Sequence, residues 1–202
     1  MALGGIVKGK KTTLRTPVEG DLAAYNRWMA DLRVRHLTKP WHEPAMPATW
    51  KEHLKSQTKD KDSILWSIEA DGALVGLVRF EFGWGDHSWG WLNQLIVDPD
   101  LWRKGHGGDA AVALHRFLFD YLDLRRLNAA VRSDAAGALA IARRFGYVEF
   151  ARGHKVHYRD GGYSDELWML LERPTWEERF AGEREYAPLG AVAAPARAKG
   201  GG

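Results

Sequence analysis

The chain has 202 residues, of which 45% are hydrophobic and 27% charged, a composition that favours one globular domain. It has no cysteine, which excludes disulfides, thiolate metal sites and cysteine nucleophiles. The net charge is +3 without a clustered basic patch, so we expect no nucleic-acid partner. No apolar run is long enough for a bilayer span or a signal peptide, so we expect no membrane association and a cytoplasmic location.

The first elements are expected to alternate between strand and helix. Residues 12–15 form a short strand, and a proline-containing cap at 16–19 starts a helix that continues through the apolar spacing of 22–29. Prolines and aromatic residues make 35–46 a loop, and 47–57 has a helical pattern again.

Three strands are expected to follow as an antiparallel meander. Residues 64–70 alternate between apolar and polar side chains up to the turn at Asp71-Gly72. The second strand covers 74–82, and a turn at 83–86 leads into the third strand, 87–97.

The third strand ends at Pro99 and leads into a short basic loop that contains Gly105, Gly107 and Gly108. The loop matches neither GxxxxGK[ST] nor GxGxxG. A helix follows, with one wide apolar stripe over 110–121. Backbone N–H groups and cations at a helix N-terminus form an anion site, and Arg103 and Lys104 would oppose the helix dipole without an anion.

The remaining elements continue this alternation. Residues 127–131 are expected to run parallel to the strand before the helix, and 135–145 forms a helix closed by Gly146. Two strands, 148–158 and 166–171, surround the turn at 160–162. We therefore expect a flexible N-terminal segment at 1–11, a domain at 12–173, and a C-terminal extension at 174–202 that is disordered after 186.

Several short motifs in this order resemble the GNAT superfamily of N-acetyltransferases, and within it the branch of ribosomal-protein N-terminal acetyltransferases. The matching pieces are Leu14-Arg15-Thr16, Asp98-Pro99, Trp102 to Ala110, Phe145-Gly146-Tyr147 and Gly162 to Asp165. The resemblance implies an α/β (α+β) fold with a mixed, largely antiparallel central sheet and helices on both faces.

The resemblance also implies that the anion is the pyrophosphate of acetyl-CoA. The activity would be direct transfer of the acetyl group to a primary amine within a ternary complex, by a monomer or homodimer that uses no metal. The strand backbone would pair with the pantetheine arm, and the loop amides would bind the pyrophosphate. The implied cofactor-binding residues are Leu95, Ile96, Val97, Arg103, Lys104, Gly105, His106, Gly107, Gly108 and Asp109.

The sequence departs from the family pattern where the catalytic groups are expected. Trp102 stands where many members have glutamine or arginine, and the stretch 91–94 lacks the carboxylate that often acts as general base. The polar candidates are Asn93 and Glu81, because strand alternation allows only one of Asn93 and Gln94 to face the substrate. An α-amine needs less help from a base than a lysine-like amine, so the missing carboxylate favours an α-amine or a water-relayed base.

The acceptor is expected between the first helices and the loops of the meander. The candidates there are Trp28, Trp41, His42, Trp84 and Asp86, with Tyr163 as a further member, although these tryptophans are equally compatible with a core. An aromatic groove with few acids favours a peptide or protein N-terminus or an amphipathic small-molecule amine. The alternatives are an antibiotic or metabolite N-acetyltransferase, a catalytically silent acyl-CoA-binding module and a nucleic-acid-binding module.

Overall fold

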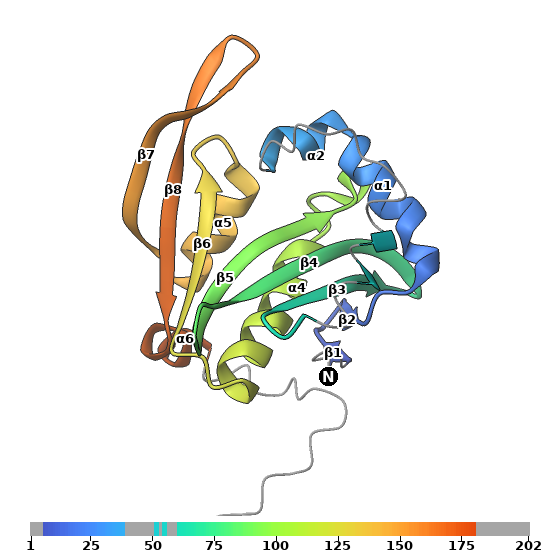
Figure 1. Ribbon diagram of the computed structural model, residues 1–202, viewed down its shortest axis with the longest axis horizontal. Helices are drawn as coiled ribbons and strands as arrows, with labels where there is room; N and C mark the ends of the chain where they lie inside the picture. Colours follow the sequence, from blue (N-terminus) through green and yellow to red (C-terminus); the bar gives the residue numbers. More distant parts are fainter. Residues whose placement is uncertain (1–5, 39–50, 53, 56–59, 181–202) are drawn as a thin grey trace, which may run out of the picture.

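A computed structural model describes residues 6–38, 51–52, 54–55 and 60–180 (Figure 1). Its centre is an eight-stranded sheet with the order β1-β2-β3-β4-β5-β6-β8-β7. All neighbouring strands are antiparallel except β5 and β6, which are parallel. The expected mixed, largely antiparallel sheet is therefore confirmed.

The expected elements that the structure describes occur in the expected order. The strands are β1 (Val7–Lys8), β2 (Thr13–Arg15), β3 (Ser63–Ala70), β4 (Ala73–Gly83), β5 (Asp86–Val97), β6 (Arg126–Arg132), β7 (Val148–Arg159) and β8 (Gly162–Glu172). The helices are α1 (Leu22–Ala30), α2 (Leu32–Leu37), α4 (His106–Arg116), α5 (Ala136–Phe145) and α6 (Arg173–Phe180). Among these elements, β1, α2 and α6 were not predicted. A π-helical turn, Phe117–Tyr121, extends α4. Part of the expected loop at 35–46 is the end of α2, and the rest of it, like most of the helix expected at 47–57, lies outside the described residues.

Helices lie on both faces of the sheet because its central strands are apolar on both sides. In β4, Val78 and Phe80 belong to the core cluster beneath α4 and α5, whereas Leu77 belongs to a second cluster with residues of α1. Alternate residues of a strand face opposite sides. We therefore distinguish the α4/α5 face of the sheet from the α1/α2 face.

The packed part of the chain extends beyond the expected domain at both ends. Val7 is buried and pairs with Leu14, so packing already begins within the segment 1–11 that we expected to be flexible. At the other end, Trp176 and Phe180 of α6 are buried against Phe145. Packed residues of the described part of the chain therefore lie on both sides of the expected bounds 12–173.

The only parallel pair among the described strands is short. β5 and β6 pair from Trp89 with Arg126 to Leu92 with Ala129, and beyond these residues the two strands separate (Figure 1). We call this short β5–β6 pairing the seam. The four strands that precede β5 lie on one side of it, and β8 and β7 lie on the other. In the part of the chain described, no helix is long and apolar enough to cross a membrane.

Candidate functional site

The separation of β5 from β6 leaves one edge of β5 without a strand partner among the described residues. Beyond Leu92, β5 remains paired with β4 only, from Arg79 with Gln94 to Gly76 with Val97. Asn93 has no opposite residue on β4, so it forms a β-bulge. The N–H and C=O groups on the open edge need partners, and an extended ligand with amide groups can supply them.

The chain leaves β5 through a turn that is fixed by Asp98. This carboxylate accepts hydrogen bonds from Trp28 Nε1 at 2.8 Å and from Arg27 Nη2 at 2.8 Å, both on α1. Burial raises its pKa, but the hydrogen bonds from Trp28 and the Asp100 N–H outweigh burial, and the net pKa lies below its ordinary value. A second clamp is the indole of Trp102, whose Nε1 donates to the carbonyl oxygen of Val97 at 2.8 Å. The unusual tryptophan at this position therefore holds the end of β5 against the glycine loop.

The loop then enters α4 through two left-handed residues. Arg103 has a φ of 66°, which is uncommon for a residue with a side chain, and Gly105 has a φ of 89° at the helix N-terminus. The first turn of α4 lies close to its neighbours. A Cβ at Gly107 would lie 3.4 Å from Val97 Cγ2, and one at Gly108 would lie 3.8 Å from Arg144 Nη1 of α5. Both are ordinary van der Waals distances, so the first turn of α4 packs beside β5 and α5 with room for a methyl group at either glycine.

Asp109 connects this first turn to the N-terminal segment of the chain. Its carboxylate accepts hydrogen bonds from the backbone N–H groups of Lys10, Lys11 and Thr12, each at 2.9 Å, and from Thr12 Oγ1 at 2.8 Å. Asp109 was expected to contact the cofactor, but these bonds use its oxygens. We therefore assign it to positioning the N-terminal segment.

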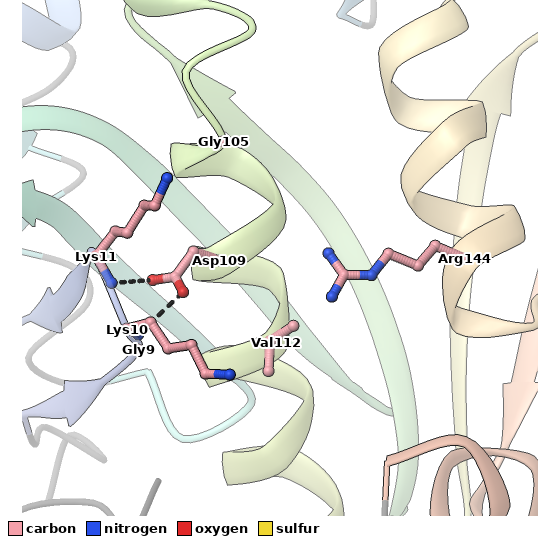
Figure 2. Close-up of a pocket in the computed structure, with 7 residues that line it drawn as sticks. All are labelled: Gly9, Lys10, Lys11, Gly105, Asp109, Val112 and Arg144. Atoms are coloured by element: carbon pink, nitrogen blue, oxygen red, sulfur yellow. Dashed lines mark hydrogen bonds between the residues drawn. The ribbon is translucent and has the colours of Figure 1, made fainter. Parts of the chain in front are cut away.

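This connection creates a cationic pocket beside the start of α4 (Figure 2). Its volume is about 270 Å³, and it is lined by Gly9, Lys10, Lys11, Gly105, Asp109, Val112 and Arg144. Figure 2 shows Lys10 and Lys11 on one side of α4 and Arg144 on the other, with the guanidinium directed toward α4. Sequence reasoning missed these three cations, because the lysines lie in a segment that was expected to be flexible and Arg144 lies in the last turn of another helix.

Positive charge dominates the start of α4. Arg103 and Lys104 add to the three cations of the pocket, and the pocket's one acid, Asp109, is engaged by backbone N–H groups. Nδ1 of His106 is buried without a hydrogen-bond partner among the described residues. Cations near a helix N-terminus oppose its dipole, so the arrangement fits a ligand with several negative charges. Within the described ranges, no group of histidine and acidic residues is arranged to hold a metal.

Of the catalytic candidates, Glu81 lies on the α1/α2 face near the end of the β5–β6 pairing, and Asn93 lies in the bulge just beyond it. Glu81 pairs across the strands with Trp91, and Trp91 pairs with Asn128 of β6. The Glu81 carboxylate forms an ion pair with Arg79 at 2.5 Å. Asn93 is exposed, and because it occupies a bulge, the alternation that separated it from Gln94 is interrupted there.

Asn128 is a polar residue near this row that sequence reasoning missed. It is buried, and its Oδ1 has no partner among the described residues. The signal in the sequence was one amide in the otherwise apolar stretch Leu127 to Val131. A buried, unpaired amide oxygen beside the seam is available to a ligand.

The structure does not bring together those of the expected acceptor-binding residues that it describes. Trp28 is 1% exposed and belongs to the core, because its indole is directed to Asp98. Trp84 is 97% exposed in the β4–β5 turn, and Asp86 in the same turn binds Ser88. That turn lies at the opposite end of β5 from the glycine loop. Trp41 and His42 lie outside the described residues.

A second pocket lies beyond the C-terminal end of β6, between β6 and the β7–β8 hairpin. It is about 200 Å³ in volume and is lined by Arg132, Ser133, Asp134, Arg159, Gly162, Tyr163 and Ser164. Arg159 also donates to the backbone carbonyls of Arg35 and Thr38, at the end of α2. Among the residues that were expected at the acceptor and that the structure describes, only Tyr163 lines this pocket.

Comparison with known proteins gives the chain a family context. Residues 11–148 match the family described as "Acetyltransferase (GNAT) domain". RimJ of Mycobacterium smegmatis, solved in complex with CoA-disulfide, is 18% identical with a TM-score of 0.73, covering 90% of this chain and 94% of RimJ. The spermidine N-acetyltransferase of Vibrio cholerae, solved with CoA and spermine, is 20% identical with a TM-score of 0.72, covering 82% of this chain and 98% of that one. A GNAT acetyltransferase of Bacillus anthracis is 16% identical with a TM-score of 0.70, covering 84% and 99%. No curated protein matches the sequence.

Proposed function

This chain belongs to the acetyltransferase (GNAT) family, whose profile spans more than half of its length, and on that premise we propose that it moves the acetyl group of acetyl-CoA to a primary amine within a ternary complex. As a family member it is an N-acetyltransferase. The acceptor is a peptide or protein N-terminus or a small-molecule amine. The similarity to RimJ supports the first class, and the similarity to the spermidine N-acetyltransferase supports the second.

The observation that carries the proposal is the open edge of β5 that ends in the cationic start of α4. CoA combines a chain of amide groups with a strongly negative nucleotide, and the two halves of the site match these two parts. The edge beyond Leu92 would pair with the pantetheine arm. The backbone of 103–108, with Lys10, Lys11 and Arg144, would bind the phosphates.

Bound acetyl-CoA would supply a thioester whose carbonyl carbon is open to attack by an amine. The residues of this chain would position the amine and remove its proton. The backbone N–H groups around the bulge at Asn93 would stabilise negative charge that develops on the carbonyl oxygen. Glu81 lies on the α1/α2 face and would act through water, since its carboxylate is already engaged by Arg79.

The proposed chemistry predicts a preference for α-amines. An α-amino group has a pKa of about 7.7–8.0 and is substantially neutral near pH 7.5, whereas a lysine side chain with a pKa of about 10.4 is not. A site whose candidate base reaches the amine only through water therefore suits the less basic amine. Comparable turnover of a free lysine side-chain amine and an N-terminal amine would contradict this preference.

The direct test is a thiol-release screen with acetyl-CoA and four acceptor classes: peptides, amino acids, polyamines and aminoglycosides. Release of free CoA that depends on both substrates supports the proposal. Binding of acetyl-CoA in calorimetry without thiol release from any amine would instead identify the chain as a silent acyl-CoA-binding module. Absence of acetyl-CoA binding would contradict the donor site itself.

A further inference from the structure

We propose that the pocket at the end of β6 is an anion subsite of the acceptor, so that the preferred substrate is a small primary amine that carries a carboxylate or a phosphate. This inference rests on the proposed acetyl transfer and narrows its acceptor class. It concerns the pocket lined by Arg132, Asp134, Arg159, Tyr163 and Ser164, which we call the β6 pocket.

Two buried polar groups in the β6 pocket lack partners. Arg132 is 5% exposed, and its Nη1 makes no hydrogen bond in the described part of the chain. Ser164 is 9% exposed, and its Oγ is likewise without a partner there. A buried hydrogen-bond donor without a partner lowers the stability of the fold, and the penalty is larger when the donor belongs to a charged group such as a guanidinium. Two such donors from neighbouring strands in one pocket are accounted for by a ligand that accepts hydrogen bonds.

The charges of the β6 pocket show the sign of that ligand. Asp134 neutralises part of Arg132 by accepting from its Nε at 2.9 Å and from its Nη2 at 2.6 Å, and this pairing lowers the pKa of Asp134 to about 2. Arg159 adds a second guanidinium, whose pKa is lowered by burial and then by the nearby charge of Arg132. Among the lining residues two arginines therefore face one acid, and the excess positive charge calls for an anion.

The framework of the β6 pocket is rigid. Ser133 and Asp165 exchange two hydrogen bonds, from Ser133 N to the Asp165 carbonyl at 2.9 Å and from Asp165 N to Ser133 Oγ at 3.0 Å. Arg159 is held by its bonds to the backbone carbonyls of Arg35 and Thr38, which join the β7–β8 hairpin to the C-terminal end of α2. Such preorganised donors suit recognition of a small charged group.

The β6 pocket also lies at a suitable distance from the reacting groups. Arg132 is three residues beyond Ala129, the last residue of β6 that pairs with β5, so it lies about 10 Å farther along the strand. Its cross-strand neighbour is Glu166, and the row includes Asn128 and Ala130 on the α1/α2 face. A volume of about 200 Å³ is below the usual range for a whole ligand, which indicates a subsite for one end of the acceptor.

This assignment disfavours polyamines. A spermidine-like acceptor would bring several positive charges toward two arginines, whereas an amine with an anionic group would pair with them. The similarity to the spermidine N-acetyltransferase therefore extends to the fold but, on this proposal, not to the acceptor.

The experiment compares matched pairs of acceptors in the thiol-release assay: an amino acid with its carboxamide and phosphoethanolamine with ethanolamine, with spermidine as the polycation. We expect kcat/KM to be at least about tenfold higher for the anionic member of a pair. Comparing the carboxylate pair with the phosphate pair shows which of the two anionic groups the pocket prefers.

Ser164→Ala is the most selective variant, because it removes a hydroxyl that has no protein partner. We expect about a tenfold rise in KM for the anionic acceptor, an unchanged KM for acetyl-CoA and an unchanged or higher melting temperature. Arg132→Lys keeps the positive charge but removes the planar guanidinium with its several N–H donors, and it should also raise the KM for the acceptor. Arg125→Gln, which removes an exposed cation just before the start of β6, at the opposite end of the strand from the pocket, is the matched control and should leave all constants unchanged.

The outcomes separate this inference from the proposed function. Equal turnover within all pairs, or an acceptor KM that Ser164→Ala leaves unchanged, overturns the anion subsite while acetyl transfer stands. Preference for spermidine overturns it in the same way. Absence of thiol release with every amine contradicts the proposed function together with the subsite.

Discussion

Replacing Asp109 with alanine tests whether the N-terminal segment is part of the donor site. The substitution removes all four hydrogen bonds that fix residues 10–12 to α4. Two of these bonds are part-buried and two are exposed. At about 1 kcal/mol for each, and less for the exposed ones, the free energy of unfolding should fall by about 2–4 kcal/mol.

The same change should weaken binding of acetyl-CoA, because Lys10 and Lys11 would no longer be held beside α4. Two cations in an exposed pocket contribute about 0.5–1 kcal/mol each, which corresponds to a rise of about 5–30-fold in Kd. Isothermal titration calorimetry with acetyl-CoA measures this directly, and chemical denaturation measures the stability.

A double-mutant cycle separates the two effects. In a chain with Lys10→Ala and Lys11→Ala, the backbone N–H groups still bind Asp109, so Asp109→Ala should still reduce stability but should no longer change the Kd. Lys8→Ala is the control, since Lys8 lies in the same segment outside the pocket. If the Kd effect of Asp109→Ala persists without the two lysines, or is absent with them, our reasoning about the N-terminal segment fails.

Three further predictions concern single side chains. Glu81→Gln should lower the rate most at low pH, where the amine most needs a base, and a pH–rate profile identical to that of the unchanged enzyme would exclude this carboxylate as the relayed base. Trp102→Phe removes the donor to Val97 and should raise the Kd for acetyl-CoA severalfold in calorimetry, with no change if the indole only packs. Burial lowers the pKa of His115 to about 4, so the unfolded state takes up a proton that the folded state does not as the pH falls from about 6.5 to 4. Over that window the free energy of unfolding should decrease by up to about 3 kcal/mol from this residue, and denaturation of His115→Gln should lack that slope.

The local patterns of the sequence predicted most of the fold. The strands of the meander, α4 with its apolar stripe, and α5 with Gly146 at its end all occur as expected. These elements are determined by the periodicity of neighbouring residues and by turn residues. Helix α6 was not predicted, because it carries mostly charged residues and buries only Trp176 and Phe180.

The parts of the site that were missed depend on contacts between distant residues. Lys10 and Lys11 are positioned at the cationic pocket by backbone bonds to Asp109, which is almost a hundred residues away in the sequence. Trp28 has a helical spacing that fits a groove or a core equally well, and its bond to Asp98 decides for the core. The β6 pocket had no local motif, since Arg132 and Ser164 are neighbours only through strand pairing.

The short seam between β5 and β6 has a consequence for how bound acetyl-CoA affects the stability of the sheet. Strands β1–β5 are consecutive antiparallel neighbours, and β6–β8 form a second contiguous group. Among the strands that the structure describes, four residue pairs are the only strand pairing that joins the two groups. The proposed donor site is bounded by β5 and α4 from one group and by β6 and α5 from the other, so neither group contains it alone. Acetyl-CoA bound there would contact both groups and hold them together. Because a ligand that binds only the folded state stabilises it, protection of the β5 and β6 amides from hydrogen exchange should rise with acetyl-CoA concentration.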